Sequence, residues 1–194
     1  MFTAPSAMSA PPSADPLVEL LSLIPDALLD IRYATADNPA GRPLYPFAAA
    51  FLRRSAARKL AVAADGLRRQ GLRLVVYDAY RPLSAQRALW EACPDPRYVA
   101  NPARGSAHNR GGAVDLGLAD RSGRPLPMPS AYDAFGPEAA HGAGAPQPRA
   151  NAERLRAALV AAGFEPLAEE WWHYRDPACD GGPPLDASFE ELRR

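Results

Sequence analysis

The spacing of apolar positions changes along the chain, and each spacing predicts a type of element. Between residues 47 and 70, small and apolar side chains recur at helical intervals, which predicts a helix with Gly71 as its C-terminal cap. The run LRLVVYDAY at 72–80 is apolar and bounded by turn residues, as in a buried strand. We expect a second helix to start at an N-cap, Ser84, and to continue through 85–92.

Residues 111–118, GGAVDLGL, alternate between the two faces of a predicted strand. Branched side chains lie on one face, and Asp115 shares the other with an alanine and a glycine, so that it points away from the apolar side. These small neighbours leave room for a bulky group to approach the carboxylate. A final helix over 151–163 and a final strand over 164–176 are expected to follow.

Loop-like composition marks the stretches between these elements. Residues 1–16, rich in Pro, Ser and Ala, are expected to form a disordered leader, and the ordered domain is expected over 17–194. Residues 27–34 have strand character, whereas 127–148 is long for a connection without structure, which favours a lid or substrate loop. Helices that alternate with hairpin-spaced strands predict one α+β domain, in which helices flank a single, mainly antiparallel sheet.

The balance of charge limits the partners that this domain can have. The 194 residues suit one domain, and 22 basic against 22 acidic residues leave no basic stripe for nucleic acid or anionic lipid, so that a small ligand is expected. The N-terminus lacks a positively charged signal region, and no uninterrupted apolar segment reaches membrane-spanning length, which predicts a cytoplasmic protein. Cys93 and Cys179 are far apart in sequence and are expected to be reduced, packed thiols.

The chain contains only three histidines, so the position of each one is informative. A catalytic zinc ion binds three protein ligands, commonly imidazole nitrogens and carboxylate oxygens, and keeps a fourth position open. His108 and Asp115 are two candidates, and His173, at the end of the last predicted strand, is a third. Either Glu169 or Glu170 could then act as general base, and strict strand alternation favours Glu169 because it shares a face with His173.

Each of these residues also has a purely structural interpretation. A single histidine on a strand is more often part of a hydrogen-bonded framework than a metal ligand, and Asp115 could be a surface carboxylate. Arg81, in the sequence YDAYRP, could stabilise a negative oxygen or simply pair with Asp78 or Asp95. The third histidine, His141, is expected to be exposed or on the substrate side, rather than a ligand.

Four motifs, in order along the chain, together resemble those of a known family. SAHNRGGAVDL at 106–116 is similar to the S-x-H-x-x-G-x-A-x-D signature of the zinc D-alanyl-D-alanine dipeptidases, the VanX-like branch of the M15 peptidases. EWWHY at 170–174 is similar to their E-x-x-H motif, and YDAYRP at 77–82 and YATADNPAGRPLY at 33–45 match that branch in type and order. The resemblance covers about Leu17 to Asp176 and implies a zinc site like that of the hedgehog and DD-peptidase domains.

The resemblance implies one zinc ion per chain, held by His108, Asp115 and His173, and hydrolysis of a dipeptide by metal-activated water. It also implies that Glu170, and not Glu169, is the general base, which overrules the argument from strand alternation. The strand must then twist or end between Glu170 and His173. Removing the Glu170 carboxylate is expected to leave the metal bound but to abolish most turnover.

The family pattern implies roles for four further residues. Arg81 would stabilise the tetrahedral oxyanion, and Ser106, Tyr33 and Asp133 match positions that contact the dipeptide. The carboxylate of Asp133 suits the ammonium group of the substrate, and the hydroxyl of Ser106 suits its carboxylate. The sequence departs from the family pattern in 134–148, which is expected to roof the pocket, so the departure concerns substrate range more than catalysis.

Three functions are open from the sequence. The first is a dipeptidase that cleaves free D-alanyl-D-alanine, with this small dipeptide as partner and a homodimer as a possible assembly. The second is a D,D-carboxypeptidase or peptidoglycan endopeptidase that acts on longer murein peptides, and the third is an inactive zinc-binding domain like those of hedgehog signalling proteins. The lack of a secretion signal and the YDAYRP motif favour the first over the second. Glu170 and Arg81 argue against the third, because a structural zinc site needs neither a base nor an oxyanion donor.

Overall fold

The computed structural model describes residues 15–134 and 136–194 of the chain. Residues 1–14 of the expected leader lie outside the described residues. Asp15, which the sequence analysis assigned to that leader, is in contact with the folded domain, because its carboxylate accepts hydrogen bonds from the backbone amide and the hydroxyl of Ser55.

Five strands form the central sheet, in the order β2–β4–β5–β7–β6. Their bounds are β2 Leu28–Leu29, β4 Leu72–Asp78, β5 Ala113–Asp120, β6 Glu165–Leu167 and β7 Glu170–Arg175. β2 is parallel to β4 and the other neighbouring pairs are antiparallel, so the prediction of a mainly antiparallel sheet is confirmed. A separate two-stranded sheet pairs β1 (Leu17–Glu19) with β3 (Phe51–Arg53).

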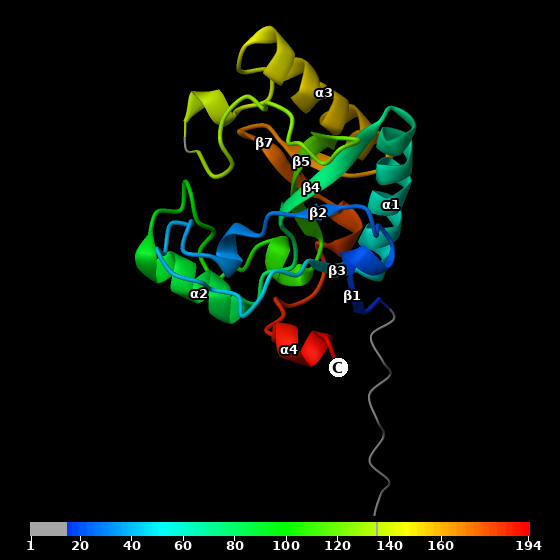
Figure 1. The fold of residues 1–194 in the computed structure, drawn as a ribbon. Coiled ribbons are helices and arrows are strands. Elements are labelled where there is room, and N and C mark those ends of the chain that lie inside the picture. The colour runs from blue at the N-terminus through cyan, green and yellow to red at the C-terminus, as the bar shows by residue number, and fades with distance from the viewer. Residues whose placement is uncertain (1–14, 135) are drawn as a thin grey trace, which may run out of the picture.

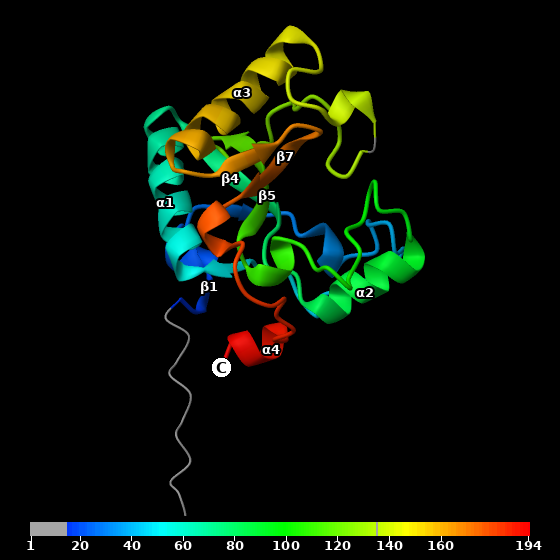
Figure 2. The ribbon, with the colours of Figure 1, turned by 180° about the vertical axis from the view of Figure 1, so that it is seen from behind.

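The α-helices differ in how closely they approach the central sheet. Their bounds are α1 Arg54–Arg69, α2 Leu83–Ala92, α3 Pro146–Ala161 and α4 Phe189–Leu192. Short 3-10 helices cover Leu20–Ser22, Arg32–Ala34, His108–Arg110, Pro137–Ala139 and Pro177–Cys179. α1 and α3 contact each other and pack on the sheet, while α2 lies on the opposite side of the molecule (Figures 1 and 2). Within the described residues, we find no helix whose length and apolar character would let it cross a bilayer.

The apolar face of β5 packs into the main core, as its alternation predicts. Leu116 and Leu118 of this strand and Leu155 of α3 belong to one buried cluster. A fully buried leucine side chain contributes roughly 1.5–3 kcal/mol to stability, so these side chains help to hold β5 and α3 in one core. Cys93 and Cys179 are free thiols, as expected, and Cys179 is buried in the same cluster.

Two predicted helices start at different residues from those expected. The helix expected from residue 47 begins only at Arg54, because residues 51–53 pair with β1 instead. That pairing joins Phe51 to Glu19, which are distant in sequence, and local helical spacing cannot reveal it. α3 begins at Pro146, before its expected start at residue 151, and proline is well accepted in the first turn of a helix.

Two further predictions, the N-cap at Ser84 and the strand over 27–34, are wrong in detail. Ser84 is not an N-cap: α2 begins at Leu83, with Pro82 in the cap position, two residues before the expected cap. The amide of Ser84 donates to the carboxylate of Asp186 in the C-terminal segment. The strand expected over 27–34 is limited to 28–29, because a 3-10 helix follows almost at once.

The strand expected over 164–176 is in fact two strands, β6 and β7, which form a hairpin. Pro166 pairs with Tyr174, but the next residue, Leu167, pairs with Glu170, so the register shifts between these two positions. Residues 171–173 therefore have no partner on β6 in this ladder. Such a bulge breaks the regular alternation of side chains along β7.

Candidate active site

His108 lies in the short 3-10 helix that leads into β5. Its Nδ1 is 2.7 Å from the carbonyl oxygen of Ala79, so this nitrogen carries the proton and donates it there, which leaves Nε2 free as a ligand. The turn into β5 uses Gly111, whose φ of 72° lies in the region that favours glycine. A Cβ at this position would also lie only 2.4 Å from a methyl carbon of Leu17, so packing requires glycine as well.

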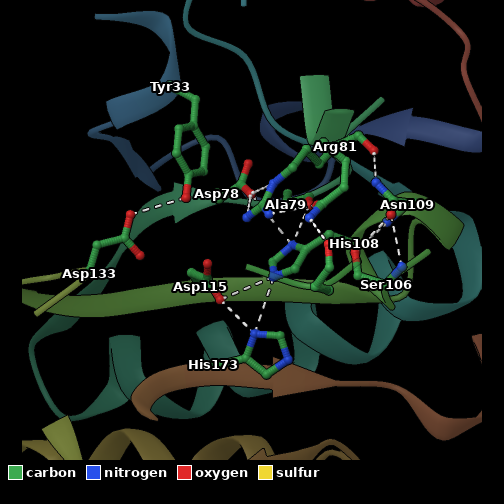
Figure 3. A network of polar contacts seen from close by, with 12 residues as sticks. Tyr33, Asp78, Ala79, Arg81, Ser106, His108, Asn109, Asp115, Asp133 and His173 are labelled. Carbon is green, nitrogen blue, oxygen red and sulfur yellow. Dashed lines mark hydrogen bonds and ion pairs between the residues drawn. The ribbon is translucent and has the colours of Figure 1, made fainter. Parts of the chain in front are cut away.

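Asp115 and His173 are register partners in the ladder between β5 and β7. Asp115 Oδ1 and His173 Nδ1 are 3.0 Å apart, and His108 Nε2 is 3.4 Å from that oxygen and 3.2 Å from that nitrogen (Figure 3). Ligand atoms about 2.1 Å from a tetrahedral zinc ion would be about 3.4 Å from one another. Two imidazoles and one carboxylate, from separate segments, thus form a set that could hold one metal ion.

Asp115 and His108 each change the pKa of the other. Burial opposes ionisation of Asp115, but His108 and His173 outweigh it and hold the pKa of this carboxyl well below its usual range. Burial likewise lowers the pKa of His108, and the charge of Asp115 outweighs this effect and raises that pKa above its ordinary value. Without metal, the triad therefore combines an ionised carboxylate with an imidazole that holds a proton readily. A divalent cation would displace that proton and satisfy the same ligand atoms.

Glu170, rather than Glu169, faces the triad. Glu170 Oε2 is 3.9 Å from His173 Nδ1, whereas Glu169 is exposed, because the bulge in β7 changes the alternation that favoured Glu169. The expected departure from a regular strand between Glu170 and His173 is present. Burial, followed by the charge of Asp115, raises the pKa of Glu170 to about 7, which suits a residue that takes and returns a proton near neutrality.

Arg81 is held by neighbours that leave part of its guanidinium free. Nε and Nη2 donate to Asp78 Oδ2 at 3.0 and 2.7 Å, and Nη1 donates to Gln86 Oε1 at 2.9 Å (Figure 3). A guanidinium has five N–H groups, so two of them are not used by these contacts. The structural pairing with Asp78 is thus real, but it orients Arg81 beside the triad without exhausting its donors. Asp95, the other suggested partner, pairs with Arg97.

Several residues that support this arrangement were not found from the sequence. The buried amide of Asn109 donates to the carbonyl of Arg81 and accepts from the backbone amide and the hydroxyl of Ser106, which ties the His108 turn to the YDAYRP segment. Tyr45 donates to Asp78 at 2.7 Å. Asn109 and Tyr45 both lie inside motifs that resemble the family, but no local signal assigns them these contacts, since Tyr45, for example, meets Asp78 only in the folded chain.

The candidate substrate residues gather with the triad around one cavity of about 270 Å³. Its lining includes His108, Asp115, His173, Glu170, Arg81, Ser106, Tyr33 and Asp133. Tyr33 donates to Asp133 at 3.1 Å, and the guanidinium of Arg81 lies 4.8 Å from the centre of the Tyr33 ring. Burial, followed by the charge of Asp115, raises the pKa of Asp133 to about 7. The cavity lies just below the usual size range of sites for drug-sized ligands, which favours a small substrate.

The roof of the cavity is not where the sequence placed it. Among the described residues of 134–148, none lines the cavity; the segment 96–100 does so instead, with Pro39 and Leu167. The expected roof folds onto the β6–β7 hairpin, where the amide of His141 donates to the carbonyl of Ala168. Prediction of a lid from loop length alone could not show this attachment.

His141 is neither exposed nor on the substrate side, which corrects the expectation. It is partly buried, and its ring packs 6.0 Å from that of Tyr174. Neither ring nitrogen has a hydrogen-bond partner among the described residues, and burial lowers the pKa of the imidazole. The hairpin contact of its backbone holds it away from the cavity, so it belongs to the packing of this loop.

A buried His–Asp–His set beside a carboxylate and an arginine, within an α+β domain, is typical of a metal-dependent peptidase. Comparison with known proteins agrees: the peptidase M15 family model described as D-ala-D-ala dipeptidase matches residues 13–191, and the chain belongs to this family. It is 39% identical over 175 residues to the D-alanyl-D-alanine dipeptidase of Escherichia coli K12, covering 89% of this chain and 91% of that protein. It is 33% identical to the D-alanyl-D-alanine dipeptidase of Streptomyces coelicolor, covering 75% of this chain and 83% of the relative. The protein is therefore a hydrolase of the peptidase class.

Proposed function

We propose that this protein hydrolyses the free dipeptide D-alanyl-D-alanine with one zinc ion per chain. The observation that carries the proposal is the convergence of His108, Asp115 and His173 in a small cavity that also contains Glu170. The names of the two relatives support the substrate, and the family membership supports the reaction. The cytoplasmic location and the homodimer remain predictions from the sequence and its resemblance.

Zinc fits the donor set better than harder cations do. Imidazole nitrogen suits zinc and other transition metals, whereas calcium and magnesium prefer sites made of oxygen ligands alone. Nε2 of His108 and Nδ1 of His173 would hold the ion together with Oδ1 of Asp115, and the carbonyl of Ala79 fixes the tautomer of His108. When bound, zinc supplies Lewis-acid polarisation of the peptide carbonyl and makes water a stronger acid.

Glu170 is positioned to move the proton in this reaction. In its ionised form it takes a proton from the attacking water and then passes it to the amine that leaves when the peptide bond breaks. Arg81 would donate its unused N–H groups to the carbonyl oxygen, which becomes negative as the tetrahedral intermediate forms. Because Asp78 and Gln86 hold the guanidinium in place, little reorganisation is needed during this step.

The two ends of the dipeptide require opposite charges from the cavity. Asp133 would bind the ammonium group, and the nearby Tyr33 hydroxyl orients this carboxylate. The Ser106 hydroxyl lies at the cavity wall, where it donates to Asn109 Oδ1, and it would turn this proton to the terminal carboxylate of the substrate. A long murein peptide would need an open path at the ammonium end, and a cavity of about 270 Å³ favours the dipeptide instead.

The proposal can be tested by comparing three substrates before and after removal of metal. We expect D-alanyl-D-alanine to be hydrolysed, and L-alanyl-L-alanine and a longer peptide ending in D-alanyl-D-alanine to be hydrolysed far more slowly. A chelator should abolish the activity, and added zinc should restore it. Preferred cleavage of the longer peptide would contradict the substrate assignment, and zinc-loaded protein without activity on any D,D-peptide would contradict the proposed chemistry.

A further inference from the structure

Asp115 presents its two carboxylate oxygens to different partners. Oδ1 faces the two imidazoles of the triad, and Oδ2 accepts a hydrogen bond of 3.0 Å from the hydroxyl of Tyr132. We propose that Tyr132 is a positioning residue for the metal site, which holds Asp115 so that it binds through Oδ1 alone. This inference rests on the proposed function.

The ring of Tyr132 is fixed on two sides by other aromatic residues. It stacks on Tyr77 with ring centres 4.7 Å apart and an angle of 15°, and it meets Trp172 edge to face at 5.5 Å. Such contacts stabilise aromatic pairs beyond the area that they bury. The hydroxyl therefore reaches Asp115 from a ring that is already immobilised, so the hydrogen bond costs little additional side-chain entropy.

The strand that carries Asp115 also makes space for this stack. Gly117 lies on the same face of β5, and a Cβ added there would be 2.5 Å from the hydroxyl oxygen of Tyr77. Tyr77 can lie over the strand only because this position is glycine, and Tyr132 then packs on Tyr77. The bulky group for which the small residues beside Asp115 leave room is therefore this pair of tyrosines.

The hydrogen bond restricts what Asp115 can do toward a cation. A carboxylate with both oxygens free can rotate or bind through both of them, and a donor on one oxygen opposes both changes. A catalytic zinc site needs three protein contacts and an open position, which a second Asp115 oxygen would compete to fill. Loss of such a supporting contact typically weakens metal binding by about 10- to 100-fold.

Tyr132 also precedes Asp133 in sequence, so a different role must be separated from the one proposed. If the tyrosine only shaped the loop that carries Asp133, its hydroxyl would affect substrate binding and not metal binding. The two roles therefore predict different measurements on the same variant. If Tyr132 only shapes the loop, KM alone would change. If Tyr132 positions Asp115, zinc affinity would change.

The test is Tyr132→Phe, which removes the hydroxyl and keeps the ring. Metal-free protein is titrated with zinc in competition with a chromophoric chelator, and the dissociation constant is expected to rise about tenfold, at the lower end of the range for such contacts. Tyr77→Phe is the matched control, because it removes a hydroxyl from the same aromatic stack without touching Asp115, and it should leave the zinc dissociation constant unchanged. Thermal unfolding of the metal-free proteins verifies that both variants are folded.

An unchanged zinc dissociation constant in Tyr132→Phe, or a rise in KM alone, would overturn the inference. An equal loss of zinc affinity in both variants would also overturn it, because the effect would then come from the stack and not from the hydrogen bond. Wild-type protein that binds zinc but cleaves no D,D-peptide would contradict the proposed function while the affinity comparison still decides the role of Tyr132. Wild-type protein that binds no zinc would overturn both.

Discussion

Glu170 and Asp133 face the same cavity, and burial raises the pKa of each carboxyl group to about 7. The charge of Asp115 acts in the same direction on both. Their proposed tasks nevertheless differ, because Glu170 exchanges a proton and Asp133 must stay ionised to bind an ammonium group. A bound ammonium would lower the pKa of Asp133, whereas it does not contact Glu170 in the proposed arrangement. Each residue can therefore be tested separately.

Glu170→Gln removes the proton acceptor and preserves the shape of the side chain. We expect kcat to fall by about 10²- to 10⁴-fold, the usual contribution of a general base. Zinc content after dialysis should equal that of the wild type, because Glu170 is not among the three proposed ligand residues. Glu169→Gln is the control, since Glu169 is exposed, and it should retain wild-type kcat. Equal losses in the two variants would show that Glu170 is not the base.

Asp133→Asn tests whether the pKa of this carboxyl is raised, because a raised pKa changes how the stability of the folded protein depends on pH. The pKa of this carboxyl is about 7 in the folded protein against an ordinary value of 3.8, so between these values the folded state binds more protons than the unfolded state. This group therefore reduces stability as the pH rises from about 4 to about 7, and the reduction is complete above 7. The variant lacks this penalty.

In metal-free protein, Asp133→Asn should raise the melting temperature more at pH 8 than at pH 5. One kcal/mol corresponds to about 2–4 °C for a domain of this size, so a difference of several degrees is measurable by calorimetry. The substitution retains an oxygen that can accept the hydrogen bond of Tyr33. Glu169→Gln should shift the melting temperature by similar amounts at both pH values. If Asp133→Asn also shifts the melting temperature equally at both pH values, the pKa of the Asp133 carboxyl is not raised.

At the scale of secondary-structure elements, the sequence predicts the helices and strands that are defined by the periodicity of their own residues. β4, β5 and the body of α1 follow from their own periodicity, and each was predicted. The pairing of β1 with β3 and the bulge of β7 depend on partners distant in sequence, so neither is visible in a local pattern. The argument from strand alternation, which favoured Glu169, was wrong for this reason, because it assumes a regular strand; the resemblance to the family indicated Glu170 instead.

Two glycines in different elements are expected to respond oppositely to alanine. In Gly117→Ala, the new Cβ would lie 2.5 Å from the hydroxyl of Tyr77 and 3.0 Å from its ring, and overpacking of this kind typically destabilises by about 1–3 kcal/mol. In Gly66→Ala, within α1, the nearest side-chain atom is 3.8 Å away, so the higher helix propensity of alanine should stabilise by about 0.5–1 kcal/mol.

Urea unfolding of the metal-free proteins measures both effects. Adding Tyr77→Phe to Gly117→Ala should recover part of the lost stability, because it removes the atom closest to the new methyl group. A Gly117→Ala protein as stable as the wild type would mean that the tyrosine stack moves without cost, and the explanation of its position by this glycine would then be wrong.

At the scale of the whole molecule, the site joins segments from most of the chain. Sequence motifs indicated the three proposed ligand residues, Glu170 and Arg81, because each lies in a short motif and the order of these motifs resembles that of the family. Contacts that orient these residues could not be predicted in the same way. Tyr45 and Tyr132 contact Asp78 and Asp115, which are distant from them in sequence, and only the packed structure brings these pairs together.

The C-terminal segment supplies one such long-range contact. Phe189, at the start of α4, is buried against Tyr45 with ring centres 4.6 Å apart, and Tyr45 donates to Asp78, which holds Arg81. Phe189→Leu should reduce the free energy of unfolding by about 1–2 kcal/mol, as expected for a smaller side chain in a core. It should also lower kcat/KM, by no more than about tenfold, because Arg81 is less well oriented.

Zinc affinity of Phe189→Leu should match that of the wild type, because Nδ1 of His108, the proposed ligand beside Asp78, is held by the carbonyl of Ala79 at 2.7 Å and lies 3.6 Å from Asp78 Oδ2. Tyr45→Phe removes the hydrogen bond to Asp78 directly and should lower kcat/KM by at least as much. If Phe189 affects activity by holding Tyr45 in place, the effects of Phe189→Leu and Tyr45→Phe are not additive. The double variant should then lose less activity than the sum of the two single losses, expressed as free energies. Additive losses would show that α4 stabilises the domain but does not orient Arg81 through this tyrosine.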